Sequence, residues 1–432
     1  MYVKVTSVRN CMDLVHQIIG FFSYSAARNH ALQNSIKEVT GGNKSLTKLC
    51  ETRFTEKHSS ILNVLNLLPS LHLTFERLSQ STGETRETRQ NAALILASLE
   101  KFEFVVNLQA LAATSGLLVG ISRSLQTVGM DIVQALDDVR AIKDILQSMR
   151  ESSEKSFAKI FDSAQKLALG MNIEVEKPRV AKRSVYRPGA GIVNEQSSPS
   201  PLMGLVPAFI TGDIKTLLPA IEIYTDLLPA PDEISDEFDV WTRMWMDSEQ
   251  AAQINTAVSA LQACENAESE ALQLPNIKVL LQKLTTLQIE NYFRVNMYIP
   301  VLDGLCTHLT DRFGAAQAKS LSLVGLVPAY MTTDVKTLQP AIEFYRDILP
   351  SEHEITAEFA IWKQKWVSVD EASKVKTAVA ALSACKGDTL ANIKVLLHIL
   401  ATLPVTTAEP ERVFSKVERT ATTIRSMEEE RL

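Results

Sequence analysis

Residues 204–246 read GLVPAFITGDIKTLLPAIEIYTDLLPAPDEISDEFDVWTRMWM, and residues 325–367 repeat them as GLVPAYMTTDVKTLQPAIEFYRDILPSEHEITAEFAIWKQKWV. Without a gap, 24 of the 43 paired residues are identical. Unrelated segments of average composition match at only about one position in fifteen. The identity and the constant spacing of 121 residues indicate an internal duplication.

The duplication continues beyond this stretch. TAVSALQAC is matched by TAVAALSAC, and NIKVLLQKLTTL by NIKVLLHILATL, so the two copies cover about 203–287 and 325–403. Two copies are too few for a solenoid, so each copy is predicted to be a few helices that share a local core. The tryptophans of each copy lie four residues apart on one helical face, which favours core packing. They are Trp241, Trp245, Trp362 and Trp366.

The composition favours an ordered, helix-rich globular chain, with 46% apolar and 22% charged residues. A net charge of −6 lacks the broad basic surface of a sequence-independent phosphate binder. The five cysteines form no Cys-x-x-Cys pair, and Cys306 with His308 is too small a set for a metal site, so neither a metal nor a cofactor is predicted. The apolar run 105–121 contains Asn107 and Thr114, which favours a buried helix over a membrane span.

The remaining segments are assigned from periodicity and breaker residues. Residues 8–24 have apolar side chains at helical spacing, and 55–170 predict four to six packed helices. Residues 46–54, LTKLCETRF, predict a short strand beside a Gly-Gly turn. Residues 176–202 are rich in Pro, Gly, Ser and basic residues, which predicts a linker.

The C-terminal stretch 403–432, LPVTTAEPERVFSKVERTATTIRSMEEERL, resembles the dimerisation signature of the hAT superfamily of DNA transposases and their domesticated relatives. The matching residues are Pro404, Thr406, Thr407, Glu411, Arg412, Phe414, Ser415, Arg425 and Ser426. Three further segments are similar to family segments and follow in the family's order: LCETRFTEKHSSIL, PRVAKR and ENYFRVNMYIPVLDGL. In the first of them Phe54 stands where the family has a tryptophan. The resemblance is to the branch whose members carry a zinc-finger module and a transposase-like body.

The resemblance implies a ribonuclease-H-like core in which two Asp and one Glu hold two divalent metals for strand transfer. Glu411 matches that Glu, and no residue of this sequence matches the two Asp, so Glu411 is interpreted as a relic and the chain as not an enzyme. The resemblance also implies a dimerisation surface at the C-terminal region. Its candidate residues are Val405, Glu411, Arg412, Val413, Phe414 and Val417. Copy one departs from the family's order, because it interrupts the path from the basic loop to ENYFRV.

Nucleic-acid binding is a weaker hypothesis, resting on the family and on basic residues. Its candidates are Arg53, Phe54, Lys177, Arg179, Lys182 and Arg183. In the family the aromatic residue at the position of Phe54 lies near distorted DNA, and Phe54 offers a π-face for stacking. The alternatives are a solvated charged loop and a Phe54 that packs in the core.

The expected fold is mainly α: a helical insertion-type domain with a duplicated helical unit, plus a partial ribonuclease-H-like remnant at the two ends. The expected segments are the remnant (1–54), a helical domain (55–175), the basic linker (176–202), copy one (203–287), a connecting helix (288–320), copy two (325–403) and the hAT dimerisation motif (404–432). The expected function is that of a catalytically inactive transposase-derived protein that acts through a protein partner or as a homodimer, in the nucleus or cytoplasm and without a membrane or small-molecule ligand. The alternatives are a nuclear DNA-binding or transcriptional regulator, and a fragment of an active transposase.

Overall fold

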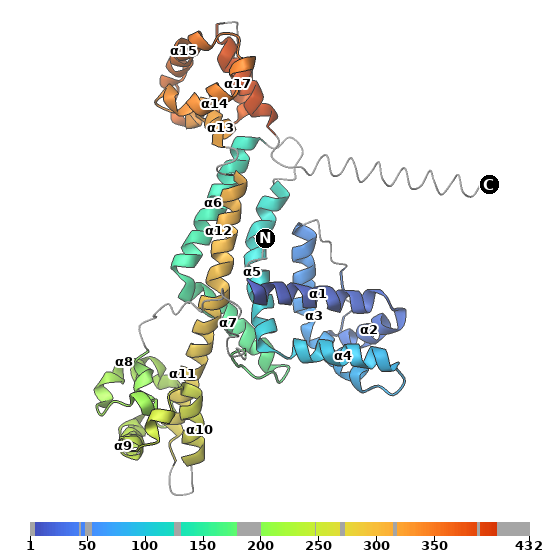
Figure 1. Ribbon diagram of the computed structural model, residues 1–432, viewed down its shortest axis with the longest axis vertical. Coiled ribbons are helices and arrows are strands. Elements are labelled where there is room, and N and C mark those ends of the chain that lie inside the picture. The colour runs from blue at the N-terminus through green and yellow to red at the C-terminus, as the bar shows by residue number, and fades with distance from the viewer. Residues whose placement is uncertain are drawn as a thin grey trace, which may run out of the picture. The chain divides into compact units, whose positions relative to one another are not determined.

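The computed structural model describes residues 5–42, 45–47, 54–124, 131–178, 200–246, 248–267, 273–313, 318–386 and 389–403. Within these ranges every regular element is a helix, which confirms the mainly α prediction (Figure 1). The strand prediction for 46–54 is wrong at Phe54, which is the first residue of helix α3 (Phe54–Gln80), the long helix that buries Ile61, Val64 and Leu68. Residues 48–53 and 404–432, which the prediction also assigns to the remnant and to the dimerisation motif, lie outside the described ranges.

The chain divides into two compact units, each assembled from separate stretches of sequence. Unit 1 contains Met1–Leu68, Leu111–Ser152 and Val301–Leu432, and unit 2 contains Pro69–Ala110 and Ser153–Pro300. The helices of the N-terminal half are α1 (Thr6–Ser23), α2 (Ala26–Thr40), α3, α4 (Arg86–Leu99), α5 (Phe102–Ser124), α6 (Ile132–Glu151) and α7 (Ser153–Leu169).

Helix α1 fulfils the prediction of a helix at 8–24, because it buries the stripe of apolar side chains that the spacing identifies. Its partner α2 starts at Ser25, whose hydroxyl accepts from the N–H of Arg28 at 3.3 Å, as an N-cap residue should. It ends at Gly41, which has a φ of 67°. Because only glycine adopts this left-handed backbone without steric cost, Gly41 closes the helix.

Helix α5 is long and apolar enough to cross a membrane, but 72% of its most apolar window is buried inside the protein. It therefore behaves as the buried helix that the sequence predicts. Its buried polar groups bond within the helix: Asn107 Nδ2 donates to the carbonyl of Glu103 at 2.6 Å, and Ser115 Oγ to that of Leu111 at 2.5 Å. Such local bonds offset the cost of taking polar groups out of water.

The duplicated sequences form two modules with matching helices (Figure 1). Module 1, the described residues of 201–287, belongs to unit 2, and module 2, those of 322–403, belongs to unit 1. Module 1 contains α8 (Leu218–Tyr224), α9 (Ile234–Trp245), α10 (Ala257–Ala267) and α11 (Pro275–Phe293). Module 2 contains α14 (Gln339–Phe344), α15 (Ile355–Val367), α16 (Ala378–Ala384) and α17 (Ala391–Thr402). Short 3₁₀ turns link the helices.

Each module has its own hydrophobic core. Module 1 is centred on Trp241 and module 2 on Trp362, both fully buried. The paired tryptophans lie edge to face, with ring centroids 5.6 Å apart in both modules. The core of module 2 also contains Val133 and Leu136 of α6. The sequence gives no sign of this packing partner.

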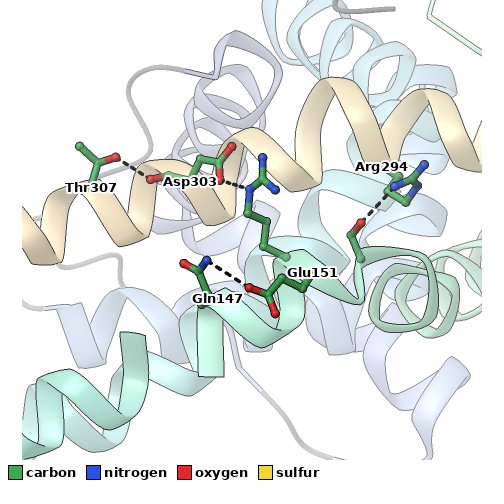
Figure 2. A network of polar contacts seen from close by, with 7 residues as sticks. Gln147, Glu151, Arg294, Asp303 and Thr307 are labelled. Carbon is green, nitrogen blue, oxygen red and sulfur yellow. Dashed lines mark hydrogen bonds and ion pairs between the residues drawn. The ribbon is translucent and has the colours of Figure 1, made fainter. Parts of the chain in front are cut away.

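Helix α12 (Ile299–Phe313) follows α11 after a π-helical turn, Arg294–Tyr298, and α13 (Ala318–Leu321) precedes module 2. In unit 1, Arg150 Nε of α6 donates to Asp303 Oδ1 of α12 at 2.6 Å (Figure 2). In unit 2, Arg294 Nη1 donates to Ser153 Oγ of α7 at 3.0 Å. Tyr298 packs on Phe157 of α7, with ring centroids 5.1 Å apart. These contacts hold α12 to α6 and the π-helical turn to α7.

Candidate interaction surfaces of the two modules

A buried glutamate caps the last helix of each module. In module 1, Glu237 of α9 accepts from the backbone N–H groups of Asn276 at 2.9 Å and Ile277 at 3.0 Å, at the first turn of α11. Glu237 is 6% exposed, and burial raises the pKa of its carboxyl, whereas the hydrogen bonds from Ile277 and Asn276 oppose that rise. In module 2, Glu358 accepts from Ile393 N at 3.0 Å in the same way. A carboxylate at a helix N-terminus satisfies orphan N–H groups and complements the helix dipole.

A buried asparagine joins this carboxylate to the loop before α9 or α15. Asn276 Nδ2 donates to Glu237 Oε1 and to the carbonyl of Ala230, both at 2.6 Å, and Asn276 Oδ1 accepts from Ala230 N at 3.1 Å. Asn392 makes the same set of bonds in module 2, to Glu358 and to Ser351. The side chain thus uses both donors and its acceptor, which fixes the relative positions of loop and helices.

The first tryptophan of each pair anchors the start of its module. Trp241 Nε1 donates to the carbonyl of Leu205 at 2.9 Å, and Trp362 Nε1 to that of Leu326 at 2.8 Å. The preceding glycines are tightly packed, because a Cβ on Gly204 or Gly325 would lie 3.1 Å from the following Thr211 or Thr332. The same interior contacts therefore hold both modules together. Because these interior residues serve the fold, a functional site is sought on the module surfaces.

The two modules expose apolar side chains at the same place. We define the α8 ridge as Ile223 and Leu227, which are 73% and 54% exposed, and the α14 ridge as Phe344 and Ile348, 59% and 56% exposed. Ile223 corresponds to Phe344 and Leu227 to Ile348 in the aligned copies. Single exposed apolar residues are ordinary, but a pair exposed in both copies makes the two ridges candidate interaction surfaces.

Charged residues that are identical in the two copies accompany the ridges. They are Lys215, Glu222 and Asp226 in module 1, and Lys336, Glu343 and Asp347 in module 2, all exposed. Beside the α14 ridge lies an open depression lined by Lys319, Lys336, Gln339, Pro340, Glu343 and Phe344. Lys319 Nζ is 5.4 Å from the Phe344 ring centroid, at a distance that permits a cation–π contact. An apolar centre with a polar rim is the usual build of a protein-binding surface.

Module 2 also receives the first turn of α6 within unit 1. Asp131 precedes α6, and its Oδ1 accepts from Val133 N at 2.9 Å, while its Oδ2 accepts from Ala378 N at 2.8 Å and from Val379 N at 3.2 Å. One carboxylate therefore caps both α6 and α16. The Tyr330 hydroxyl donates to Asp137 Oδ2, and this bond, more than burial, raises the pKa of the tyrosine.

Most residues predicted for function lie outside the described ranges. This holds for Arg53, Arg179, Lys182 and Arg183 among the nucleic-acid candidates, and for all six dimerisation candidates: Val405, Glu411, Arg412, Val413, Phe414 and Val417. Phe54 is the first residue of α3, but its side chain is not described. Lys177 is exposed. Both site predictions stay predictions.

The sequence analysis missed the Glu237–Asn276 and Glu358–Asn392 pairs. A signal was present, since both copies have a glutamate four residues before the first tryptophan and an asparagine before Ile-Lys-Val-Leu-Leu. Among the described residues, no group of three or more His, Cys, Asp or Glu side chains is placed to hold a metal ion.

Comparison with known proteins finds weak similarity to one kind of relative. The chain is 24% identical over 206 residues to the mouse 52 kDa repressor of the inhibitor of the protein kinase, and 23% identical over 312 residues to the human protein of that name. These alignments cover 47% and 64% of this chain, but only 26% and 40% of the relatives. No protein-family profile and no solved structure matches the chain.

At 23–24% identity the relatives support only a loose link to hAT-derived proteins. The link is compatible with a regulatory role other than transposition.

Proposed function

We propose that this chain is a transposase-derived regulatory protein that acts through protein–protein interaction and has lost catalysis. The observation that carries the proposal is the pair of matched apolar ridges, Ile223 with Leu227 and Phe344 with Ile348, exposed at equivalent positions of both modules. Two copies of one surface on a single chain give a bivalent binder, whose avidity exceeds the affinity of either surface. The weak similarity to proteins named as repressors supports a regulatory role.

The partner is a protein with an apolar surface, or a second copy of this chain. A few well-packed side chains near the centre of an interface carry most of its binding energy. Charges of both signs accompany the ridges, Lys215, Glu222 and Asp226 in module 1 and Lys336, Glu343 and Asp347 in module 2, which favours a partner with complementary charges of both signs around its apolar centre. The C-terminal motif is a separate candidate for self-association.

The ridges are tested with the double variant Ile223→Asp, Phe344→Asp. Proteins captured from a cell extract by the wild-type chain are expected to fall by at least about tenfold in the double variant, because a charge in the centre of each interface costs well over 1.4 kcal/mol. Quantitative mass spectrometry measures the change, and sedimentation velocity measures self-association. Folding is expected to persist, because both side chains are exposed.

A matched control is Leu94→Asp on α4, where Leu94 is 68% exposed and lies outside both modules. It introduces the same charge and should leave the captured set unchanged. An unchanged set and an unchanged sedimentation coefficient in the double variant would contradict the role of the ridges.

The loss of catalysis is tested separately. Within these 432 residues only Glu411 matches the three carboxylates of the family, and two metals need all three to be held for in-line strand transfer. The purified chain is therefore expected to nick supercoiled DNA no faster than buffer does, with either Mg²⁺ or Mn²⁺. Nicking that requires metal and disappears in Glu411→Gln would establish an active nuclease instead.

A further inference from the structure

Module 1 has a second surface whose counterpart in module 2 is already occupied by a helix. In module 2 the N-terminal end of α6 makes three polar contacts: the N–H groups of Ala378 and Val379 donate to Asp131 Oδ2, and the Tyr330 hydroxyl donates to Asp137 Oδ2. Val133 and Leu136, on the same turns of α6, complete the core of module 2. The duplication makes Ala257, Val258 and Phe209 the corresponding residues of module 1.

These three residues lack an equivalent helix in the part of unit 2 that the structure describes. Phe209 is 52% exposed, whereas Tyr330 is half-buried. Thr256, the residue before α10, is exposed, whereas its counterpart Thr377 is half-buried. No carboxylate among the described residues of unit 2 accepts from the N–H groups of Ala257 and Val258, while the third N–H, that of Ser259, bonds to Thr256 Oγ1 at 3.1 Å.

We propose that this surface of module 1 binds the first turn of an α-helix from a partner protein. We name the surface the helix seat and define it by Phe209, Ala257 and Val258. The partner helix carries an Asp at its N-cap, aliphatic side chains at its second and fifth helical positions and an apolar side chain at its sixth. The proposal goes beyond the ridges, because it assigns a different surface and a partner with a stated sequence pattern.

The pattern follows from the contacts of α6. Asp131 is the N-cap of α6, Val133 and Leu136 are its second and fifth residues, and Asp137 is its sixth. One carboxylate oxygen of an N-cap Asp accepts from an N–H group of its own helix, as Asp131 Oδ1 does from Val133 N. The other oxygen can then accept from the N–H groups of α10, as Asp131 Oδ2 does from Ala378 N of α16. The negative charge also lies favourably at the N-terminal ends of two helix dipoles.

The two modules differ in the residue that meets the sixth position of the bound helix, which is Tyr330 in module 2 and Phe209 in module 1. Tyr330 donates its hydroxyl to Asp137, but Phe209 has no hydroxyl, so an acid at this position would be desolvated against a ring without a donor. The helix seat therefore prefers an apolar side chain there. The same reasoning disfavours α6 of a second copy of this chain as the occupant and favours a foreign helix.

The seat is tested by fluorescence anisotropy with the full-length chain and labelled, N-acetylated peptides of residues 131–150. One peptide has the native sequence and the other carries Asp137→Leu. The Asp137→Leu peptide is expected to bind at least about tenfold more tightly than the native peptide. Adding Asp131→Ala to it should weaken binding by about tenfold, since the shared cap is lost. The corresponding surface of module 2 should not bind the peptides, because the chain's own α6 occupies it and an intramolecular helix has a high effective concentration.

Variants of the chain locate the binding. Phe209→Asp, at an exposed position, should lower the affinity of the chain for the Asp137→Leu peptide at least about tenfold. Leu94→Asp should leave this affinity unchanged. Phe209→Tyr gives module 1 the hydroxyl that Tyr330 provides in module 2. This variant should reduce the difference in affinity between the Asp137→Leu peptide and the native peptide. No binding at millimolar peptide, binding insensitive to Phe209→Asp, or a preference unchanged by Phe209→Tyr would overturn the proposal. None of these outcomes depends on the ridges, so this proposal and the proposed function fail separately.

Discussion

Replacing Trp362 by alanine is expected to lower the free energy of unfolding of module 2 by about 3–5 kcal/mol, since a large, fully buried side chain leaves a cavity that the core fills only in part. The substitution also removes the bond from Nε1 to the carbonyl of Leu326. Because the chain has more than one compact unit, a single global transition is not expected. Native-state hydrogen exchange of the amides of α15 and α17 measures the local free energy of opening.

The second tryptophan provides a matched control for the hydrogen bond. Trp366 is 9% exposed, and its Nε1 has no hydrogen-bond partner among the described residues. Trp362→Phe leaves the Leu326 carbonyl unpaired and should cost about 1–3 kcal/mol more than Trp366→Phe, which removes a donor that was already unsatisfied. Equal costs for the two phenylalanine variants would mean that the Trp362 bond does not anchor the module.

Removing the buried carboxylate of module 1 is expected to have the next largest effect. Glu237→Ala should lower the free energy of unfolding of module 1 by about 2–4 kcal/mol, because the N–H groups of Asn276 and Ile277 then lose a charged acceptor within a buried site. Hydrogen exchange should speed up first in the first turns of α11, where the cap is lost.

Asp239→Ala is the control for Glu237→Ala, because Asp239 lies on the same helix, α9, and its side chain is exposed. A surface substitution of this kind usually changes stability by no more than about 0.5 kcal/mol. If Glu237→Ala were as mild as Asp239→Ala, the buried glutamate would not be a structural cap and the account of the duplicated interior would be wrong.

The sequence predicted those parts of the fold that depend on local patterns. The helix over 8–24, the buried apolar helix after Phe102 and the core tryptophans all follow from spacing along the chain, which is the signal that amphipathic helices leave. The strand prediction failed at Phe54, because a short β-prone run is a weaker signal than the long helical period that follows it in α3. The duplication was visible because it is a comparison of the chain with itself.

The parts that were not predicted involve partners far apart in sequence. Asp131 bonds to Ala378, 247 residues away, and an aspartate at the N-cap of a helix gives no indication of a distant partner. Glu237 was missed because a glutamate on a helix is usually a surface residue, and its burial depends on Asn276 in another helix. The ridges could be placed only when the exposure of both modules was compared.

The most direct test of the central claim, that the matched ridges are where partners bind, is hydrogen exchange of the chain with and without a captured partner. Bound chain is expected to exchange more slowly in peptides that cover 214–228 and 335–349, which hold Ile223, Leu227, Phe344 and Ile348. Peptides covering α4, which lies outside both modules, should be unchanged. Protection confined to other regions, with both ridges exchanging at the free rate, would contradict the claim.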